Sequence, residues 1–217
     1  MDVRDAIEKR QSVRKYKKGD IPETDIREIL DGARLAPSGK NLQNWHFLVI
    51  KNMELKEAIS RVIWEKNEAI AKKLDRKDPE KGNRFRKFCK NFTMFYLNAP
   101  VLVLVYSCDA SPDGYEELKQ IDTPYYELNR LFQRSPALMN IGAALENINL
   151  RAIELGYGMC WMTGQNYAAE EIETLMREEI GFEKQGYYFT CMFTLGIPEE
   201  NLPSPAKKKL DEIVTWI

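Results

Sequence analysis

Several features that would reveal a familiar chemistry are missing from this sequence. Its 217 residues contain one histidine, His46, which argues against a histidine-rich zinc site and against a Ser-His-Asp hydrolase triad. The four cysteines lie far apart and form no C-x-x-C motif. We therefore expect buried free thiols, not a metal or redox centre.

Glycine-rich phosphate loops are also missing. No set of glycines fits G-x-G-x-x-G, and G-x-S-x-G does not occur. The segment G-F-E-K-Q-G, residues 181–186, has the spacing of a Walker loop, but Tyr187 stands where a lysine is required. Any phosphate held by this chain must therefore be bound by side chains.

The sequence has neither an excess of one charge nor a long apolar run. Lysine and arginine total 32 and aspartate and glutamate 33, a net charge of −1, which argues against a nucleic-acid partner. The longest apolar run, 99–106, is too short to cross a bilayer. The first ten residues, M-D-V-R-D-A-I-E-K-R, are too charged for a signal peptide. We expect a cytoplasmic protein with no membrane partner.

The patterns that are present predict interspersed helices and strands. Apolar residues recur at helical spacing in four segments, and β-branched or alternating runs mark four strands. The predicted helices are 22–35, 53–72, 137–155 and 168–179, and the predicted strands are 45–50, 99–106, 158–163 and 187–195. We expect an α+β fold in a single domain, 1–217, with a C-terminal extension at 205–217. The 137–155 helix is either a central core helix or a dimer helix.

Residues 72–91 differ from the rest of the chain. This stretch is basic and is interrupted by Pro79 and Gly82. Two interpretations stay open: a solvated connection between helices, or a mobile lid over a site.

The segment R-Q-S-V-R, residues 10–14, places Arg10, Ser12 and Arg14 at every second position. In an extended chain these side chains point the same way, so three donors would converge on one anion. In a helix, Arg10 and Arg14 would share a face without Ser12, which describes an ordinary solvated surface.

Three further stretches carry polar or permissive residues suited to a ligand. They are the loop A-P-S-G-K-N-L-Q-N-W (36–45), the strand G-Y-G-M-C-W-M-T-G (156–164) and the basic segment P-A-K-K-K-L-D-E-I-V (205–214). Each one alone is compatible with a turn, a core strand or a solvated tail.

Together and in this order, the four stretches resemble the nitroreductase family of flavin-dependent oxidoreductases. The motifs that match are R-x-S-x-R, P-S-x-x-N-x-Q-x-W, G-x-G-x-C-W, and L-G-I-P followed by a basic cluster. The resemblance runs from about residue 4 to 214. It implies a three-layer α/β/α fold with a mostly antiparallel central sheet, an intertwined homodimer, and FMN bound tightly, one per subunit, at the subunit interface.

The resemblance also implies which residues bind the flavin. Arg10, Ser12 and Arg14 would hold the phosphate and ribityl chain, and the loop at Ser38 would approach from the other subunit. Thr163 and Gly164 would lie near flavin N5 and O4. Lys207 and Lys209 would close on the phosphate, although Lys208 could replace either. The full set is Arg10, Ser12, Arg14, Pro37, Ser38, Gly39, Asn41, Met162, Thr163, Gly164, Lys207 and Lys209.

The implied activity moves electrons from NADH or NADPH to a small organic acceptor, such as a nitroaromatic or a quinone, by a ping-pong mechanism without a catalytic side chain. Three alternatives remain: an iodotyrosine deiodinase-type dehalogenase, a flavin-fragmenting enzyme that uses O2, and a non-enzymatic flavin binder. The sequence departs from the family pattern at Asn44, where proline usually precedes the tryptophan, and in its all-lysine C-terminal cluster. Several aromatic residues are either core residues or lining of an acceptor pocket: Trp45, Trp64, Phe85, Phe88 and Phe92.

Overall fold

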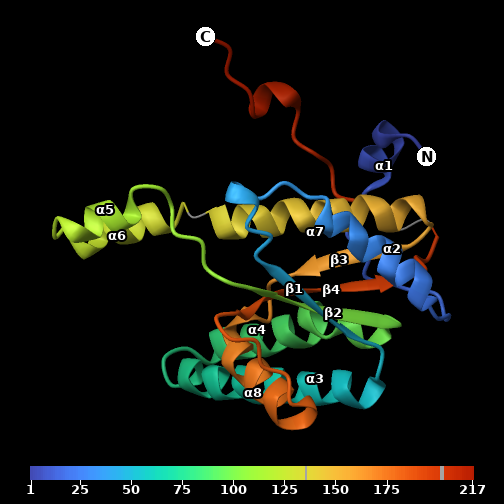
Figure 1. The fold of residues 1–217 in the computed structure, drawn as a ribbon. Coiled ribbons are helices and arrows are strands. Elements are labelled where there is room, and N and C mark those ends of the chain that lie inside the picture. Colours follow the sequence, from blue (N-terminus) through green and yellow to red (C-terminus); the bar gives the residue numbers. More distant parts are fainter. Residues whose placement is uncertain (135, 201–202) are drawn as a thin grey trace.

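A four-stranded antiparallel sheet forms the centre of the molecule (Figure 1). The computed structural model describes residues 1–134, 136–200 and 203–217. The strand order is β1-β2-β4-β3, and each neighbouring pair is antiparallel. The strands are β1 (Trp45–Ile50), β2 (Val101–Ser107), β3 (Gly158–Met162) and β4 (Tyr188–Gly196). The order places β3, a late strand in the sequence, at an edge of the sheet.

Helices cover both faces of this sheet. In Figure 1, α2 (Glu23–Arg34) and α7 (Pro136–Glu154) lie above it. Below it lie α3 (Met53–Asp75), α4 (Pro79–Phe88) and α8 (Ala169–Ile180). The result is the three-layer α/β/α arrangement with an antiparallel sheet that the resemblance implied.

Burial on both faces explains the apolar run at 99–106. Every residue of β2 is buried, because Val103 and Val105 enter the core under α7 while Leu102 and Leu104 enter the core against α3 and α8. A strand covered on both sides has no polar face to alternate with. All eight predicted elements are found, with ends displaced by at most three residues.

The face assignment of the last strand needs a correction. Strict alternation over 187–195 predicts that Phe189 shares a face with Cys191 and Phe193. In the structure Phe189 belongs to the opposite core cluster. The register between β2 and β4 shifts at Val105/Tyr106, and such a bulge reverses which face the following residues occupy.

The interpretation of 72–91 as a simple connection is wrong. Helix α3 continues to Asp75, and α4 begins at Pro79. Proline suits the first turn of a helix, because the backbone N–H that it lacks would have no partner within the helix there. Gly82 permits close packing, since a Cβ there would lie 1.8 Å from Asp75 Oδ1. Arg86 then bridges Glu68 and Asp75. Pro79 and Gly82 thus build a helical hairpin, while its role as a lid stays a prediction.

Helix α7 is a core helix. Ile141, Leu145 and Ile148 are fully buried against the sheet. Leu138, which continues the same spacing, is exposed, as is Met139, because the first turn of α7 extends beyond the sheet. None of the helices in the described ranges is both long and apolar enough to span a membrane.

Three peripheral parts contribute little to this core. Helix α1 (Val3–Lys9) buries only Ala6. The hairpin of α5 (Tyr115–Gln120) and α6 (Tyr125–Phe132) has no buried residue, and the tail 203–217 contains only one short turn, η5 (Leu210–Glu212). Figure 1 shows the hairpin and the tail projecting from the body in different directions.

Candidate functional site

Residues 10–14 are extended and not helical. Helix α1 ends at Lys9, and Arg10 already has extended backbone angles. Ser12 forms a parallel bridge with Met159 of β3, and the Val13 N–H donates to the Met159 carbonyl at 2.9 Å. The stretch therefore lies along the free edge of the sheet, and the first of the two geometries considered for R-Q-S-V-R is correct.

Two contacts hold this stretch against the sheet. A Cβ at Gly158 would lie 2.7–2.9 Å from three atoms of the Val13 side chain, so only glycine leaves room for Val13. The Tyr16 hydroxyl donates to the Val13 carbonyl and hydrogen bonds Thr194 Oγ1, each at 2.6 Å. Burial raises the pKa of Tyr16 well above its ordinary value, so the hydroxyl keeps its proton.

The three predicted donors have different neighbours. Ser12 and Arg14 lie beside Cys160: burial raises the pKa of this thiol, while the Arg14 charge and a Ser12 hydrogen bond oppose the rise. Arg10 Nε is 3.8 Å from Glu146 Oε1 on α7. An ion pair this long and partly exposed contributes at most about 1 kcal/mol. Glu146 therefore holds Arg10 only weakly, and convergence of the three donors stays a prediction.

The loop at 37–43 has a strained backbone. Lys40, Asn41 and Gln43 all adopt positive φ, between 46° and 55°. Non-glycine residues rarely do so, and such strain tends to persist at functional sites where the surroundings enforce it. The Ser38 hydroxyl accepts a hydrogen bond from the Gln43 N–H at 3.0 Å, which closes the loop.

A chain of buried amides fastens this loop to the body. Asn140 on α7 accepts from the Gly39 N–H at 3.1 Å and donates to Asn44 Oδ1 at 2.9 Å. Asn44 in turn donates to the carbonyls of Cys108 and Ala137 at 3.0 and 3.3 Å. The departure from the family pattern at Asn44 thus has a structural reason, because proline has no side-chain donor for these carbonyls.

A pocket of about 440 Å³ opens between this loop and the segment that follows β2. Gly39, Lys40 and Leu42 line one wall, and Asp109 and Asp113 lie on the other. Lys40 pairs with Asp113 at 2.5 Å. Of the predicted residues, Gly39 lines this pocket, Ser38 is half-buried, and Pro37 and Asn41 are exposed.

The end of β3 is the third part of the candidate site. Met162 is buried, Thr163 is exposed and Gly164 is half-buried. Gln165, fully buried, donates to the Thr93 carbonyl at 2.8 Å and so ties the strand end to a π-helical turn, η2 (Cys89–Thr93). A Cβ at Gly164 would lie 3.4 Å from Phe88 Cζ. Thr163 and Gly164 therefore border a surface that α4 and η2 complete.

The predicted lysines lie elsewhere. Lys207, Lys208 and Lys209 are exposed in the tail. The hydrogen bonds of the described tail, 203–217, join only its own residues. Within one chain the tail lysines are thus not brought to the 10–14 stretch, and their contact with a phosphate stays a prediction.

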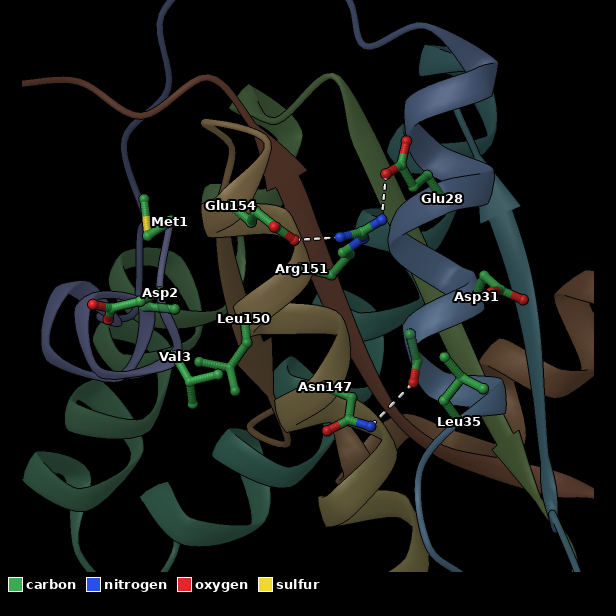
Figure 2. Close-up of a pocket in the computed structure, with 12 residues that line it drawn as sticks. Met1, Asp2, Val3, Glu28, Asp31, Leu35, Asn147, Leu150, Arg151 and Glu154 are labelled. Carbon is green, nitrogen blue, oxygen red and sulfur yellow. Dashed lines mark hydrogen bonds and ion pairs between the residues drawn. The ribbon is translucent and has the colours of Figure 1, made fainter.

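A groove of about 390 Å³ between α1, α2 and α7 contains none of the predicted residues (Figure 2). Arg151 at its centre is paired with both Glu28 and Glu154, and Asn147 donates to the Gly32 carbonyl at 3.1 Å. Asp2 is a further acidic residue of the lining, and Asp31 is paired with Arg34. An acidic groove whose arginine is already neutralised is poorly suited to a phosphate, so we place the site along β3.

Residue patterns did not reveal the positioning residues. Tyr16, Asn140 and Gln165 each hold a predicted segment in place, yet none stands in a recognisable motif. The sequence showed Asn44 as a departure from the family pattern, but it did not show the carbonyls of Cys108 and Ala137, whose hydrogen bonds explain the asparagine. Such residues act through contacts between distant segments, which spacing along one segment does not encode.

The comparisons with known proteins agree with the fold. A BluB-like flavoprotein from Clostridium difficile 630 is 53% identical, with a TM-score of 0.97 over 100% of this chain and 99% of that one. A nitroreductase from Desulfitobacterium hafniense, solved with bound FMN, has a TM-score of 0.68 at 22% identity over 100% and 99% of the two chains. The second likeness shows the shared fold.

Curated relatives extend the comparison. A Haemophilus influenzae protein provisionally named an NAD(P)H nitroreductase is 27% identical over 200 residues, 91% of this chain and 87% of that protein. The iodotyrosine deiodinase of Thermotoga neapolitana is 34% identical over 118 residues, 52% of this chain and 60% of that protein. The family model described as Nitroreductase family matches residues 7–197. Because this match spans most of the sequence and all three layers of the fold, the chain belongs to the nitroreductase family.

Proposed function

We propose that the protein is an FMN-dependent oxidoreductase that moves electrons from NADH or NADPH to a small organic acceptor. The observation that carries the proposal is the extended 10–14 stretch, which bridges β3 at Met159 and brings Ser12 and Arg14 beside Cys160, on the strand whose end leads to Thr163 and Gly164. The FMN bound in a structure of the same fold and the flavoprotein name of the 53% identical neighbour support it.

The residues present fit a flavin mononucleotide. Arg14 and Ser12 are a guanidinium and a hydroxyl on neighbouring side-chain positions, the donors that a phosphate prefers. Gly164 offers backbone without a side chain where a planar ring must approach closely. The strained loop at Ser38, Gly39 and Asn41 would contribute from the second subunit.

When bound, FMN supplies the transfer of hydride or electrons between the nicotinamide and the acceptor. The chain's own residues bind and orient it. The positive charge of Arg10 and Arg14 favours negative charge on the ligand in a partly dry site. We expect donor and acceptor to occupy the same place in turn, so initial-rate lines at several acceptor concentrations should be parallel.

The second subunit is part of the proposal. The α5–α6 hairpin exposes Ile121, Tyr125 and Tyr126, and the tail exposes Leu210 and Trp216. Figure 1 shows that both segments leave the body of the molecule. Large exposed apolar side chains on such segments are typical of surfaces that another chain covers. Sedimentation of the purified protein should give twice the mass of the chain, and a flavin-loaded monomer would contradict a site shared between subunits.

The deciding experiment is an absorbance spectrum of the purified protein before and after NADH or NADPH is added without oxygen. Peaks near ~375 and ~450 nm that fade would support the proposal. Peaks that persist with both donors would favour the flavin-binder alternative, and absence of flavin after reconstitution with FMN would contradict the cofactor. Loss of flavin itself after air is readmitted would favour the flavin-fragmenting alternative.

The dehalogenase is the second candidate, because a named deiodinase aligns with half of the chain. The same reduced preparation should be given 3-iodotyrosine. Release of iodide at a rate that exceeds the reduction of a nitroaromatic or a quinone would move the assignment to that reaction.

A further inference from the structure

A pocket of about 320 Å³ lies at the end of the sheet where β1 ends and β2 begins. Its lining comes from three segments: 17–20, the stretch 51–56 that leads into α3, and 97–100 just before β2. The first segment is held in place because the Lys17 N–H donates to the Ile197 carbonyl at 2.8 Å. The described lining contains no residue that is predicted to bind the flavin, so this pocket needs an explanation of its own.

Positive charge dominates this pocket, which we call the lysine pocket. Four of its lining residues are lysines and one is an acid: Lys17, Lys18, Lys51, Lys56 and Asp20. Asp20 is already paired with Lys51, and Lys17 is paired with Glu200, each at 2.7 Å. Among the described residues, no carboxylate is paired with Lys18 or Lys56. The lysine pocket thus keeps two positive charges that the described part of the chain does not balance.

Lys56 is the unusual member of this set. It is only 2% exposed, although lysine is rarely buried without a partner of opposite charge. Its Nζ donates to the Ala99 carbonyl at 2.7 Å, the one hydrogen bond that the described residues provide for it. An ammonium group carries more donors than this single bond uses, so it can also bind an acceptor in the pocket that it lines.

Burial makes the charge of Lys56 costly. Removal from water lowers the pKa of this amino group, since desolvation disfavours the ammonium form. Buried charges persist in folded proteins where an opposite charge compensates them. Because α3 begins at Met53, which also lines the pocket, the positive end of the helix dipole adds to the same potential. An anion in the pocket would supply the missing compensation.

We propose that the lysine pocket binds a phosphate group, either as free phosphate or as part of a small phosphate ester. Two unbalanced lysines match the charge of a dianion, with Lys56 on the buried side and the exposed Lys18 on the solvent side. Lysine binds phosphate as a point charge and does not need the planar fork of arginine. This inference goes beyond the proposed function and does not depend on the flavin or on its electron donor.

The test compares Lys56→Met and Lys18→Gln with the parent protein in excess FMN. Methionine keeps an apolar stem of similar length without the charge, and Lys18 is exposed, so its replacement should not disturb folding. Lys73→Gln is the matched control, because Lys73 is an exposed lysine near the opposite end of α3. Excess FMN keeps the predicted flavin site filled with the phosphate of the flavin itself, so added phosphate reports on another site.

Calorimetric titration with inorganic phosphate at constant ionic strength should show saturable binding of a single phosphate per chain. Lys56→Met should weaken this binding roughly tenfold or more, and Lys18→Gln roughly twofold to fivefold, because a buried charged contact contributes more than an exposed one. Lys73→Gln should bind like the parent. Adenosine monophosphate separates the two sources of the group: tighter binding than phosphate indicates an ester, and weaker binding indicates the free anion.

Thermal unfolding gives a readout that a merely structural lysine would not change. Phosphate that binds the folded chain should raise the Tm of the parent and of Lys73→Gln, but not that of Lys56→Met. Absence of saturable binding to the parent would overturn the proposal, and so would equal affinity in the parent and Lys56→Met. If Lys56→Met does not fold, Lys18→Gln decides, and parent-like affinity in that variant would overturn the proposal.

The proposed function can fail without deciding this result. If the protein holds no flavin, the titration is made with Arg14→Gln, in which the predicted phosphate site of the flavin is altered. Phosphate binding that survives this change and is lost when Lys56→Met is added would support the lysine pocket. Loss with Arg14→Gln alone would overturn the proposal, because the phosphate would then bind at residues 10–14.

Discussion

Two basic segments of this chain are predicted to hold the same phosphate, and they differ in how the rest of the chain holds them in place. The stretch 10–14 bridges β3 and is locked by Gly158 and Tyr16. The segment 207–209 lies in a tail whose described hydrogen bonds are all internal. One segment is positioned by its own chain before any ligand arrives, whereas no described hydrogen bond ties the other to the rest of the chain.

The difference indicates how much each segment contributes to the binding free energy of a site that is built from two segments. A preorganised donor loses little conformational freedom when the ligand binds. A tail that becomes ordered on binding loses conformational entropy, and this loss weakens the affinity. We therefore expect the arginine stretch to dominate affinity and the lysines to add a smaller increment that depends on the dimer. Four substitutions test this comparison, from the largest expected effect to the smallest.

Gly158→Ala should be the most damaging. The added Cβ would overlap the Val13 side chain, so the 10–14 stretch must move away from β3. We expect a loss of about 1–3 kcal/mol of unfolding free energy, typical of overpacking, together with loss of flavin. Urea unfolding and flavin content measure both. Gly142→Ala is the control, because its Cβ would meet Trp161 only at an ordinary 3.9 Å. Equal stability in the two variants would show that Val13 does not need the glycine.

Tyr16→Phe should loosen the same stretch without a clash. The change removes a buried hydroxyl that bonds both Thr194 and the Val13 carbonyl. A lost bond that leaves buried partners unsatisfied costs about 1–2 kcal/mol of unfolding free energy. Tyr126→Phe, which removes an exposed hydroxyl bonded to Glu127, should change it by less than about 0.5 kcal/mol. Similar midpoints in urea for both variants would contradict the locking role.

Arg14→Gln should weaken ligand binding without changing the stability of the fold. The residue is exposed and its recorded hydrogen bond, to the Ser12 carbonyl, is long at 3.4 Å, so unfolding should change little. Loss of a charged hydrogen bond should weaken FMN binding by about 1.5 kcal/mol, roughly tenfold in Kd. Lys15→Gln, the next position and on the opposite side of the extended chain, is the control. Fluorescence titration of apoprotein with FMN measures both, and equal Kd values would contradict the phosphate assignment.

Lys207→Gln with Lys209→Gln should have the smallest effect, about twofold to fivefold in Kd, since both lysines are exposed. A mixed dimer sharpens the comparison. If each site takes its arginines from one subunit and its lysines from the other, a dimer of one Arg14→Gln subunit and one double-lysine subunit holds one intact site and one doubly altered site. FMN titration should then show one site with the affinity of the parent protein and one weaker site. Two sites that are both weaker than the parent would show that arginines and lysines do not come from different subunits.

Local patterns predicted the elements well and their contacts poorly. Apolar spacing located α2, α7 and all four strands, because burial of one face imposes its period on the residues. The same rule assigned Phe189 to the wrong face of β4, because a bulge reverses the faces there. It also predicted that Leu138 is buried, whereas this residue is exposed where α7 extends beyond the sheet. Pro79 and Gly82 suggested a break, although one starts α4 and the other lets it pack closely.

By itself, the sequence determined the absence of a glycine-loop phosphate site, the order of helices and strands, and the four motifs that carry the family resemblance. These follow from residue types and short spacings, which act within a few positions of the chain. Only the tertiary structure decided that residues 10–14 are extended beside β3, that Asn44 and Asn140 hold the strained loop, and that Phe88 and Thr93 meet the strand end at Gly164. Each of these depends on segments tens of residues apart coming into contact, and the free energy of such contacts is set by packing in three dimensions, not by local pattern.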